Sequence, residues 1–260
     1  MILSEIMERL EAFCPASFAQ DWDNVGLQTG RTASDISTVC LCVDATSAVI
    51  DEARRHGAQL LVTHHPLLFT GTKRVTDQDY VGKRILELAR NDIACFSLHT
   101  NFDVLHMADA AADDLRLRNR RVLEVTFEDD LSREGLGRIG DLPEHMTLGE
   151  CAAFVRDTFR IPNVRVFGDP EQPVVCAAVL PGSGGDEIDI SLKEGADVMI
   201  TGDISHHKGI DAVEKGIAVI DAGHYGIEKI FVPYMRDFLR REFPDLTVIE
   251  AKESDPFITV

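Results

Sequence analysis

Short apolar runs rich in β-branched residues alternate along the chain with segments of helical periodicity, and this alternation constrains the fold most strongly. Strands are expected at residues 37–43, 59–63 and 93–98, with helices at 46–56 and 79–90 between them. Successive parallel strands need a crossover helix between them. The order therefore predicts an α/β fold with mostly parallel or mixed sheets covered by helices.

A glycine-rich segment at residues 128–147 interrupts this alternation and is typical of turns. Beyond it, strands are expected again at 197–201 and 217–221. We therefore predict two interlinked α/β domains. Residues 1–127 together with 217–260 form the first, and residues 128–216 form the second. No low-complexity linker separates them, so we expect the two halves to pack tightly.

Two stretches of the chain resemble each other. Residues 56–63 (HGAQLLVT) match 194–201 (EGADVMIT), and each reads as a helix end, a glycine stop and a strand that closes in threonine. Further on, Ile93-Ala94 leads to His99 and Asp103, while Ile217-Ala218 leads to His224 and Glu228. The matched blocks are short. If they are two equivalent βαβ units whose strand ends face each other, both His-x-x-x-carboxylate pairs meet at a domain interface.

Histidines and carboxylates follow several of the predicted strands, at the carboxyl ends where parallel sheets place reactive groups. The candidate metal ligands are His64, His65, Asp103, His224 and Glu228. Imidazole and carboxylate together suit Zn, Fe, Mn, Co or Ni rather than Mg or Ca. Two carboxylates can bridge, so five ligands favour two divalent ions about 3.5–4 Å apart. Glu228 is our candidate bridge, since positions i and i+4 share a helix face with His224.

Other features carry weaker signals. His99 is the repeat partner of His224, and a proton-shuttling, substrate-contacting or second-layer role is as well supported as a structural one. His206-His207 starts a helix, where an exposed structural role is favoured over metal binding. Residues 21–27 (DWDNVGL) favour a packed loop cap. Residues 182–185 (GSGG) favour a tight turn over a phosphate cradle, because the lysine and spacing of a P-loop are missing.

The net charge limits the classes of partner, and the cysteines indicate the compartment. The formal net charge of −18 argues against nucleic acid and anionic lipid as partners. No run reaches the roughly 20 apolar residues of a membrane span. The six cysteines form no CxxC pair, and four of them lie in apolar runs. Together these features predict a cytoplasmic protein without disulfides.

Six short motifs occur in order along nearly the whole chain. They are DNVGLQ at 23–28, THHP at 63–66, HTNFD at 99–103, GLGRIG at 135–140, ITGD at 200–203 and GHYGIE at 223–228. In this order and spacing the chain resembles the GTP cyclohydrolase I type 2 family, also described as dinuclear metal-centre hexameric proteins.

The resemblance implies two interlinked α/β domains and a toroidal homohexamer, a trimer of dimers, with metal sites facing its interior. Matched motif by motif, it implies the same five ligands, His64, His65, Asp103, His224 and Glu228. The chain departs from the usual family pattern at 107–113 (MADAAAD). This departure puts any ligand or subunit contact from that helix start in doubt and leaves the metal ligands untouched.

The resemblance also implies a reaction. A metal-dependent hydrolase would open the ring of a nucleotide with metal-activated water, GTP being the substrate in the family's name, and His99 could shuttle the protons. The alternative is a non-catalytic hexameric scaffold, or a protein that stores or delivers metal. Nucleic-acid handling through the ring is a third reading, which the charge of −18 opposes.

Overall fold

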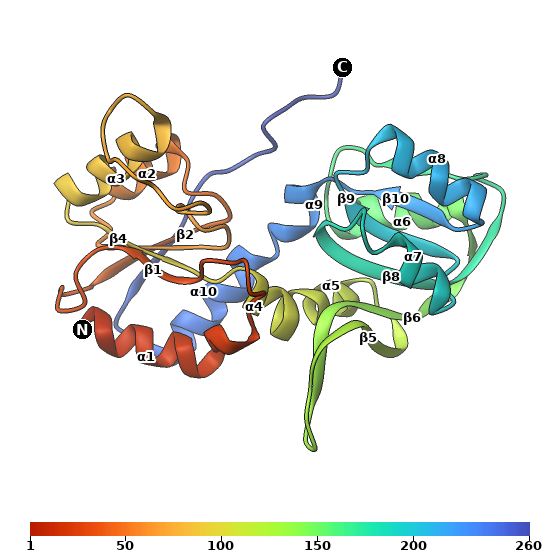
Figure 1. The fold of residues 1–260 in the computed structure, drawn as a ribbon, viewed down its shortest axis with the longest axis horizontal. Helices are drawn as coiled ribbons and strands as arrows, with labels where there is room; N and C mark the ends of the chain where they lie inside the picture. Colours follow the sequence, from red (N-terminus) through yellow and green to blue (C-terminus); the bar gives the residue numbers. More distant parts are fainter. The chain divides into compact units, whose positions relative to one another are not determined.

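A computed structural model describes residues 1–260. The chain divides into two compact units, residues 1–102 with 231–260, and residues 103–230. Each unit holds one sheet with helices on its faces (Figure 1), which confirms the predicted α/β class. None of the helices combines the length and the apolar character needed to cross a membrane.

The first unit is built on a five-stranded sheet in the order β1-β4-β3-β2-β11. The strands are β1 (Gly26–Thr29), β2 (Thr38–Cys42), β3 (Leu60–Thr63), β4 (Ala94–Ser97) and β11 (Thr247–Glu250). All pairs are parallel except β1 with β4. The parallel core agrees with the continuous apolar character of β2 to β4, because strands buried on both faces need no polar side.

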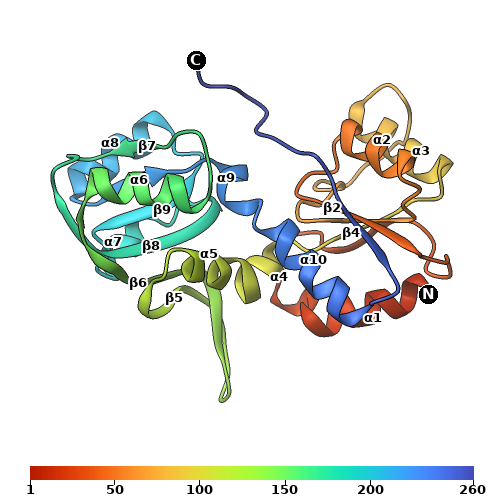
Figure 2. The same ribbon diagram turned by 180° about the vertical axis from the view of Figure 1, so that it is seen from behind.

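Helices cover both faces of this sheet (Figures 1 and 2). They are α1 (Leu3–Phe13), α2 (Ser47–Arg55), α3 (Tyr80–Arg90) and α10 (Phe231–Glu242), with a short 3₁₀ turn at Ala16–Phe18. On the α2 and α3 face, Cys40, Cys42 and Cys95 belong to the apolar core. Burial raises the pKa of the Cys40 and Cys95 thiols to about 12. These cysteines therefore act as small hydrophobic residues, as predicted.

The second unit is built on a six-stranded mixed sheet in the order β5-β6-β8-β9-β10-β7. The strands are β5 (Arg118–Glu128), β6 (Arg133–Thr147), β7 (Arg165–Phe167), β8 (Pro173–Ser183), β9 (Val198–Gly202) and β10 (Ala218–Asp221). Strands β8, β9 and β10 run parallel, and the remaining pairs are antiparallel.

Alternation along these strands divides the core of the second unit into two layers. Val198 and Ile200 pack with α5 (Ala108–Asp114) and α6 (Leu148–Thr158) on one face. Met199 packs with α7 (Ile188–Lys193) and α8 (His206–Lys215) on the other (Figure 2). Successive side chains of a strand point to opposite faces, so the same strands supply both layers.

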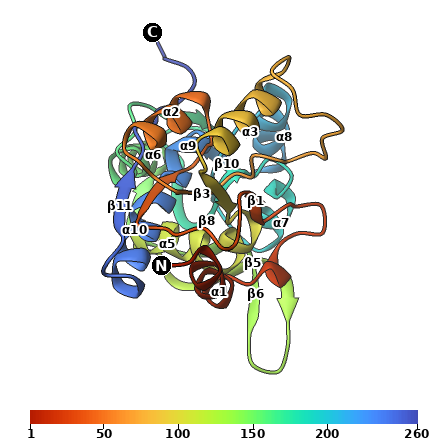
Figure 3. The same ribbon diagram turned by 90° about the vertical axis from the view of Figure 1, so that its left-hand side faces the viewer.

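The interpretation of residues 128–147 as a turn-rich segment is wrong, because most of it is strand β6. Its glycines are needed for close pairing rather than for turns. A Cβ at Gly135 would lie 1.9 Å from the carbonyl oxygen of Glu124, and one at Gly140 would lie 2.5 Å from that of Arg118. Strands β5 and β6 continue as a hairpin beyond the rest of their sheet (Figure 3).

The two compact units divide at 102/103 and 230/231, whereas the sequence placed the divisions at 127/128 and 216/217. The reason is strand pairing. Strand β5 pairs with β6, and β10 pairs with β9, so both segments belong to the second sheet. These strands pair with neighbours in the chain, but local composition does not show which of the two sheets each pair joins.

The two matched stretches of sequence form equivalent βαβ units. One is β3-α3-β4 and the other is β9-α8-β10. Their parallel registers correspond as well, since Leu60 pairs with Ala94 and Val198 pairs with Ala218. In both units the second strand is followed directly by the segment that carries a His-x-x-x-carboxylate pair.

Candidate metal centre

His64 and His65 follow β3 in the first unit, and both rings are held through Nδ1. His64 Nδ1 lies 2.9 Å from the carbonyl oxygen of Leu98, and His65 Nδ1 lies 3.0 Å from Asp44 Oδ1. A carbonyl oxygen can only accept, so His64 Nδ1 donates. The lone pair of a neutral ring then sits on Nε2, the atom a metal would need. The His64 side chain is fully buried.

Asp44 is itself anchored by the C-terminal segment of the chain. The Glu253 carboxylate accepts hydrogen bonds from the backbone N–H groups of Val43, at 2.7 Å, and Asp44, at 2.9 Å. Burial raises the pKa of Glu253 above its usual value. Sequence reasoning did not single out either acid, because their contact spans more than two hundred residues.

His99 is oriented in the same way, by an aspartate that the sequence reasoning assigned to a loop cap. His99 Nδ1 lies 2.9 Å from Asp23 Oδ1, and Asp23 Oδ2 accepts the backbone N–H of Thr100 at 3.0 Å. Burial alone would raise the pKa of Asp23, but the hydrogen bonds from His99 and Thr100 outweigh it and lower the pKa to about 2. Asp23 is therefore an orienting carboxylate rather than a simple cap. Its position in the DNVGLQ motif was the available signal.

The three histidines of the first unit form a cluster. Ligand atoms of His64, His65 and His99 all lie within 4.8 Å of one another. The ring centroids are 4.9 Å apart for His64 and His65 and 5.2 Å apart for His64 and His99. This cluster could hold a metal ion by itself, which makes His99 a candidate ligand as well as a candidate proton carrier.

In the second unit, His224 and Glu228 lie on one face of the short helix α9 (His224–Glu228), as their spacing predicted. His224 Nε2 is 3.1 Å from Glu228 Oε2, and His224 Nδ1 is 2.8 Å from Asp203 Oδ2. Glu228 is buried with 3% of its surface exposed. A buried carboxylate beside an imidazole held through Nδ1 is a suitable donor pair for a divalent ion.

Glycines at the ends of β8 and β9 let these strands approach the helix. A Cβ at Gly182, where φ is +81°, would lie 2.6 Å from Glu228 Oε1. A Cβ at Gly202 would lie 2.6 Å from the backbone nitrogen of His224. Gly182 and Gly202 therefore serve close packing against α9, and the turn expected at 182–185 begins only after Ser183, where β8 ends.

Asp103 begins a single π-helical turn, Asp103–Met107, which follows the short helix α4 (Thr100–Phe102) and leads into α5. Such turns often occur at functional sites. The turn is fixed by Arg138, which is 4% exposed. Its guanidinium donates to Asp109 Oδ1 at 3.0 Å, to Asp109 Oδ2 at 2.8 Å and to the carbonyl oxygen of Val104 at 3.3 Å.

Arg138 belongs to the GLGRIG motif, and sequence reasoning gave it no role. Its partner Asp109 lies in the segment 107–113, where the chain departs from the usual family pattern. Asp109 therefore supplies a carboxylate that holds Arg138 beside the turn after Asp103.

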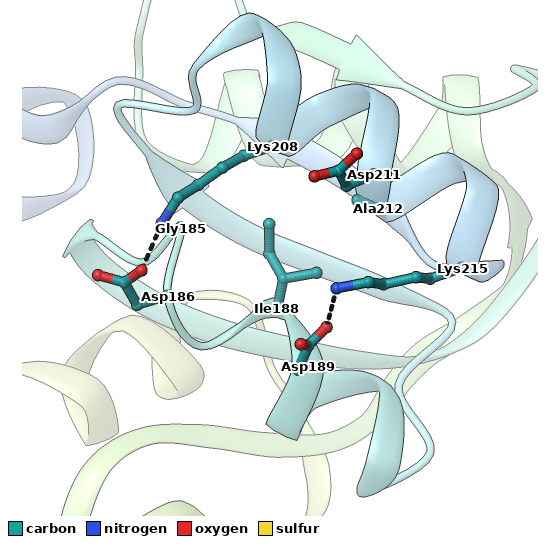
Figure 4. A pocket seen from close by; sticks show the side chains of 8 residues that line it. All are labelled: Gly185, Asp186, Ile188, Asp189, Lys208, Asp211, Ala212 and Lys215. Atoms are coloured by element: carbon teal, nitrogen blue, oxygen red, sulfur yellow. Dashed lines mark hydrogen bonds and ion pairs between the residues drawn. The ribbon is translucent and has the colours of Figure 1, made fainter.

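The second unit has a surface pocket lined by residues of the turn at 185–187, the start of α7 and α8 (Figure 4). Lys208 Nζ lies 2.5 Å from Asp186 Oδ1, and Lys215 Nζ lies 2.5 Å from Asp189 Oδ1. Both ammonium groups are already neutralised, so the pocket is poorly suited to phosphate.

His206 and His207 lie exposed at the start of α8 with ring centroids 5.4 Å apart, and no carboxylate orients either ring.

The donor groups fit a transition-metal ion. Four imidazoles are each held at Nδ1 by a backbone carbonyl or a carboxylate, the usual arrangement around metal-binding histidines. They belong to His64, His65, His99 and His224. His64, His65 and His99 belong to the first unit, and Asp103, His224 and Glu228 belong to the second.

The fold and these residues define an α/β protein that carries candidate metal ligands at the ends of its parallel strands. The chain belongs to the Duf34/NIF3 (NGG1p interacting factor 3) family, whose model matches residues 1–256.

Relatives and solved structures agree with this membership. A protein of Clostridium perfringens named GTP cyclohydrolase 1 type 2 homolog is 33% identical over 99% of both chains. One of the same name from Clostridium acetobutylicum is 35% identical over 87% of this chain and 85% of its own. Among solved structures, reduced HcgD from Methanocaldococcus jannaschii has a TM-score of 0.83 at 32% identity and covers 97% of this chain and 98% of its own. A hypothetical protein of Staphylococcus aureus has a TM-score of 0.90 at 27% identity, and the match covers 100% of this chain and 99% of its own.

Proposed function

We propose that the chain binds two divalent metal ions through His64, His65, Asp103, His224 and Glu228 and acts as a metal-dependent hydrolase. The observation that carries the proposal is the shared orientation of the imidazoles, each held at Nδ1 by a hydrogen-bond acceptor. This orientation fixes the tautomer and directs Nε2 for coordination. The proposal requires the donors of the two units to act on one centre.

When bound, such ions lower the pKa of coordinated water and so supply a nucleophile at neutral pH. The chain's own residues would orient the reactants and move protons. His99 lies beside His64 and His65, and Asp23 fixes its ring at Nδ1. In this proposal His99 Nε2 accepts a proton from the attacking water and returns it to the leaving nitrogen of the substrate.

The substrate class we propose is a nucleotide whose heterocyclic ring is opened, GTP being the first candidate. The support is the name carried by relatives at 33% and 35% identity, GTP cyclohydrolase 1 type 2 homolog. The net charge of −18 does not oppose an anionic substrate, because bound ions reverse the local potential.

The test is metal content and turnover on the same samples. Wild-type protein would be loaded with Zn, Mn, Fe, Co or Ni and incubated with a panel of nucleotides. We expect His64→Ala and Glu228→Ala to lose metal and turnover together, while His206→Ala keeps both. Turnover that survives His64→Ala and Glu228→Ala would refute the metal-centred mechanism. Full loading without turnover on any nucleotide would favour the scaffold or metal-storage role.

The role of His99 is resolved by the same measurements. A proton carrier predicts that His99→Ala keeps its metal and loses turnover, whereas a ligand predicts that metal content also falls. Asp23→Asn should change metal content and turnover in the same direction as His99→Ala but by less, because it disturbs only the orientation of the His99 ring.

We also propose that the protein works in the cytoplasm as a homohexamer, which the family resemblance implies. Five of the six cysteines are buried and none forms a disulfide, which supports a reducing compartment.

A further inference from the structure

A second pocket lies within the first unit, beside His65. It is formed by the loop after β3 and the start of α3, and its volume is about 370 Å³, within the usual range for small-molecule sites. The residues that line it are Asp44, Ala45, His65, Pro66, Leu67, Phe69, Thr70, Tyr80, Val81 and Arg84. The pocket therefore combines a candidate metal ligand, apolar walls and one fixed cation.

The aromatic residues at this pocket are unusually open. Tyr80 is 68% exposed and Phe69 is 56% exposed. Phe69 also packs against Trp22, which is 59% exposed, with ring centroids 5.7 Å apart. Large apolar side chains grouped at a surface mark a binding site, since leaving them in water is unfavourable. Their flat faces suit a planar ring, which would gain stacking and burial together.

Arg84 provides the charge in the lining. Its guanidinium carbon lies 5.0 Å from the centroid of the Tyr80 ring, and Nε donates to Ser47 Oγ at 3.4 Å. Most arginines of this acidic chain pair with a carboxylate; Arg90 on the same helix, for example, binds Glu87 at 2.7 Å. Arg84 makes no such ion pair, so its guanidinium can accept an anionic group from a ligand, often through two parallel hydrogen bonds.

We propose that this pocket binds the substrate of the metal centre and selects a planar heterocycle that carries an anionic group. The ring stacks on Tyr80 and Phe69, the anionic group binds Arg84, and the reacting part of the ring lies toward His65. The inference rests on the proposed function and adds to it the residues that choose the substrate.

Binding to metal-loaded protein, measured by isothermal titration calorimetry, tests these assignments. The probes are GTP, guanosine, inorganic triphosphate and orotate, a planar heterocycle with a carboxylate. We expect Arg84→Gln to weaken GTP or orotate binding about ten-fold or more and to leave guanosine unchanged, because a hydrogen bond to a charged group is lost. Tyr80→Ala should weaken the binding of GTP and of guanosine but not that of triphosphate. Tyr80→Phe should restore the binding of both GTP and guanosine.

Arg90→Gln is the matched control, since it removes an arginine from the same helix outside the pocket. If Arg84→Gln weakens the binding of GTP, the anionic group is a phosphate. If it weakens the binding of orotate, the anionic group is a carboxylate. The proposal would be overturned if the wild type bound neither GTP nor orotate, or if wild type and Arg84→Gln bound them with equal affinity.

The pocket and the hydrolase can fail separately. Binding that depends on Arg84 and Tyr80 without turnover retains the pocket and refutes the reaction. Metal-dependent turnover with unchanged kcat/KM in Arg84→Gln and Tyr80→Ala retains the reaction and refutes the pocket. Circular dichroism and metal content of each variant verify that it is folded and loaded.

Discussion

At the residue scale, the acids that orient the histidines matter as much as the histidines. Asp44, Asp203 and Asp23 each accept from the Nδ1 of one ring, and Leu98 does so through its carbonyl oxygen. These contacts fix the tautomer, so each ring presents a lone pair at Nε2 without a cost in rotational freedom. His206 and His207 lack such partners, which separates them from the candidate ligands.

Removal of one orienting acid should weaken metal binding without unfolding the protein. We expect Asp203→Ala to lower the affinity for Zn about 10- to 100-fold, because His224 loses its partner at Nδ1. Competition with a fluorescent chelator measures the change. Asp211→Ala, at the pocket of the second unit in Figure 4, removes an acid that contacts no candidate ligand and should leave the affinity unchanged.

Asp23 predicts a pH dependence of stability. Its folded pKa of about 2 lies below the ordinary value of 3.8, so the ionised form favours folding. This contribution, about 2 kcal/mol, is fully present above pH 4 and is lost as the pH falls toward 2. Urea unfolding of metal-free wild type and Asp23→Asn should therefore differ most above pH 4 and converge below it. A difference that stays constant between pH 5 and pH 3 would contradict the assignment.

At the element scale, glycines and one buried arginine determine how strands and turns reach the candidate ligands. Gly182 lets the end of β8 lie against Glu228, and Gly135 and Gly140 let β5 and β6 pair closely. Arg138 on β6 holds the π-helical turn that begins at Asp103. In each case a residue that the sequence presents as a turn former or a lone charge is required by a tertiary contact.

Gly182→Ala separates backbone strain from displacement of the ligand. Gly182 has a φ of +81° and a neighbour at 2.6 Å, Glu228 Oε1, whereas Gly216 has a φ of +92° and no neighbour within 4 Å. Both alanine variants should lose about 1 kcal/mol of stability from the left-handed backbone. Only Gly182→Ala should also reduce metal affinity, measured by the same chelator competition. Equal metal affinity in the two variants would argue against Glu228 as a ligand.

Arg138→Met should destabilise the second unit strongly. The change leaves Asp109 with only its longer contact to Arg120, at 3.5 Å, and takes a donor from three backbone carbonyls, at a cost of about 3 kcal/mol in urea unfolding. Arg133→Met is the control. Arg133 also lies on β6, but its only ion pair is the exposed one with Glu128 on β5, at 3.8 Å, worth less than about 1 kcal/mol. Similar losses in both variants would show that the buried contacts of Arg138 contribute little.

At the scale of the whole molecule, two units with one sheet each carry different halves of the proposed donor set. His64 and His65 follow β3 in the first unit, whereas Asp103, His224 and Glu228 all belong to the second unit. On a chain with a net charge of −18, Arg84 is an arginine without an ion pair that lines the pocket beside His65.

The homohexamer is a prediction at this scale. Light scattering of metal-loaded protein should give about six times the chain mass of 28.7 kDa. A monomer mass over the micromolar range would refute the assembly carried over from the family, while leaving the ligand assignments open to the metal assays.

The sequence by itself determined the α/β class, the alternation of strands and helices in the parallel parts of both sheets, the internal repeat and the candidate ligands at strand ends. These properties follow from local periodicity and from the rule that parallel strands end at one edge of a sheet. They also explain why His224 and Glu228 could be paired from spacing alone, since a helix places positions i and i+4 side by side.

Only the tertiary structure decided which residues orient those ligands and where the two units divide. Asp23 reaches His99 across 76 residues and Glu253 reaches Val43 across 210, and such contacts leave no local pattern. The unit boundaries depend on β5 and β10 joining the second sheet through hydrogen bonds to β6 and β9. Long-range packing selects among partners that look alike in sequence, because burial and geometry, rather than spacing, determine which carboxylate meets which histidine.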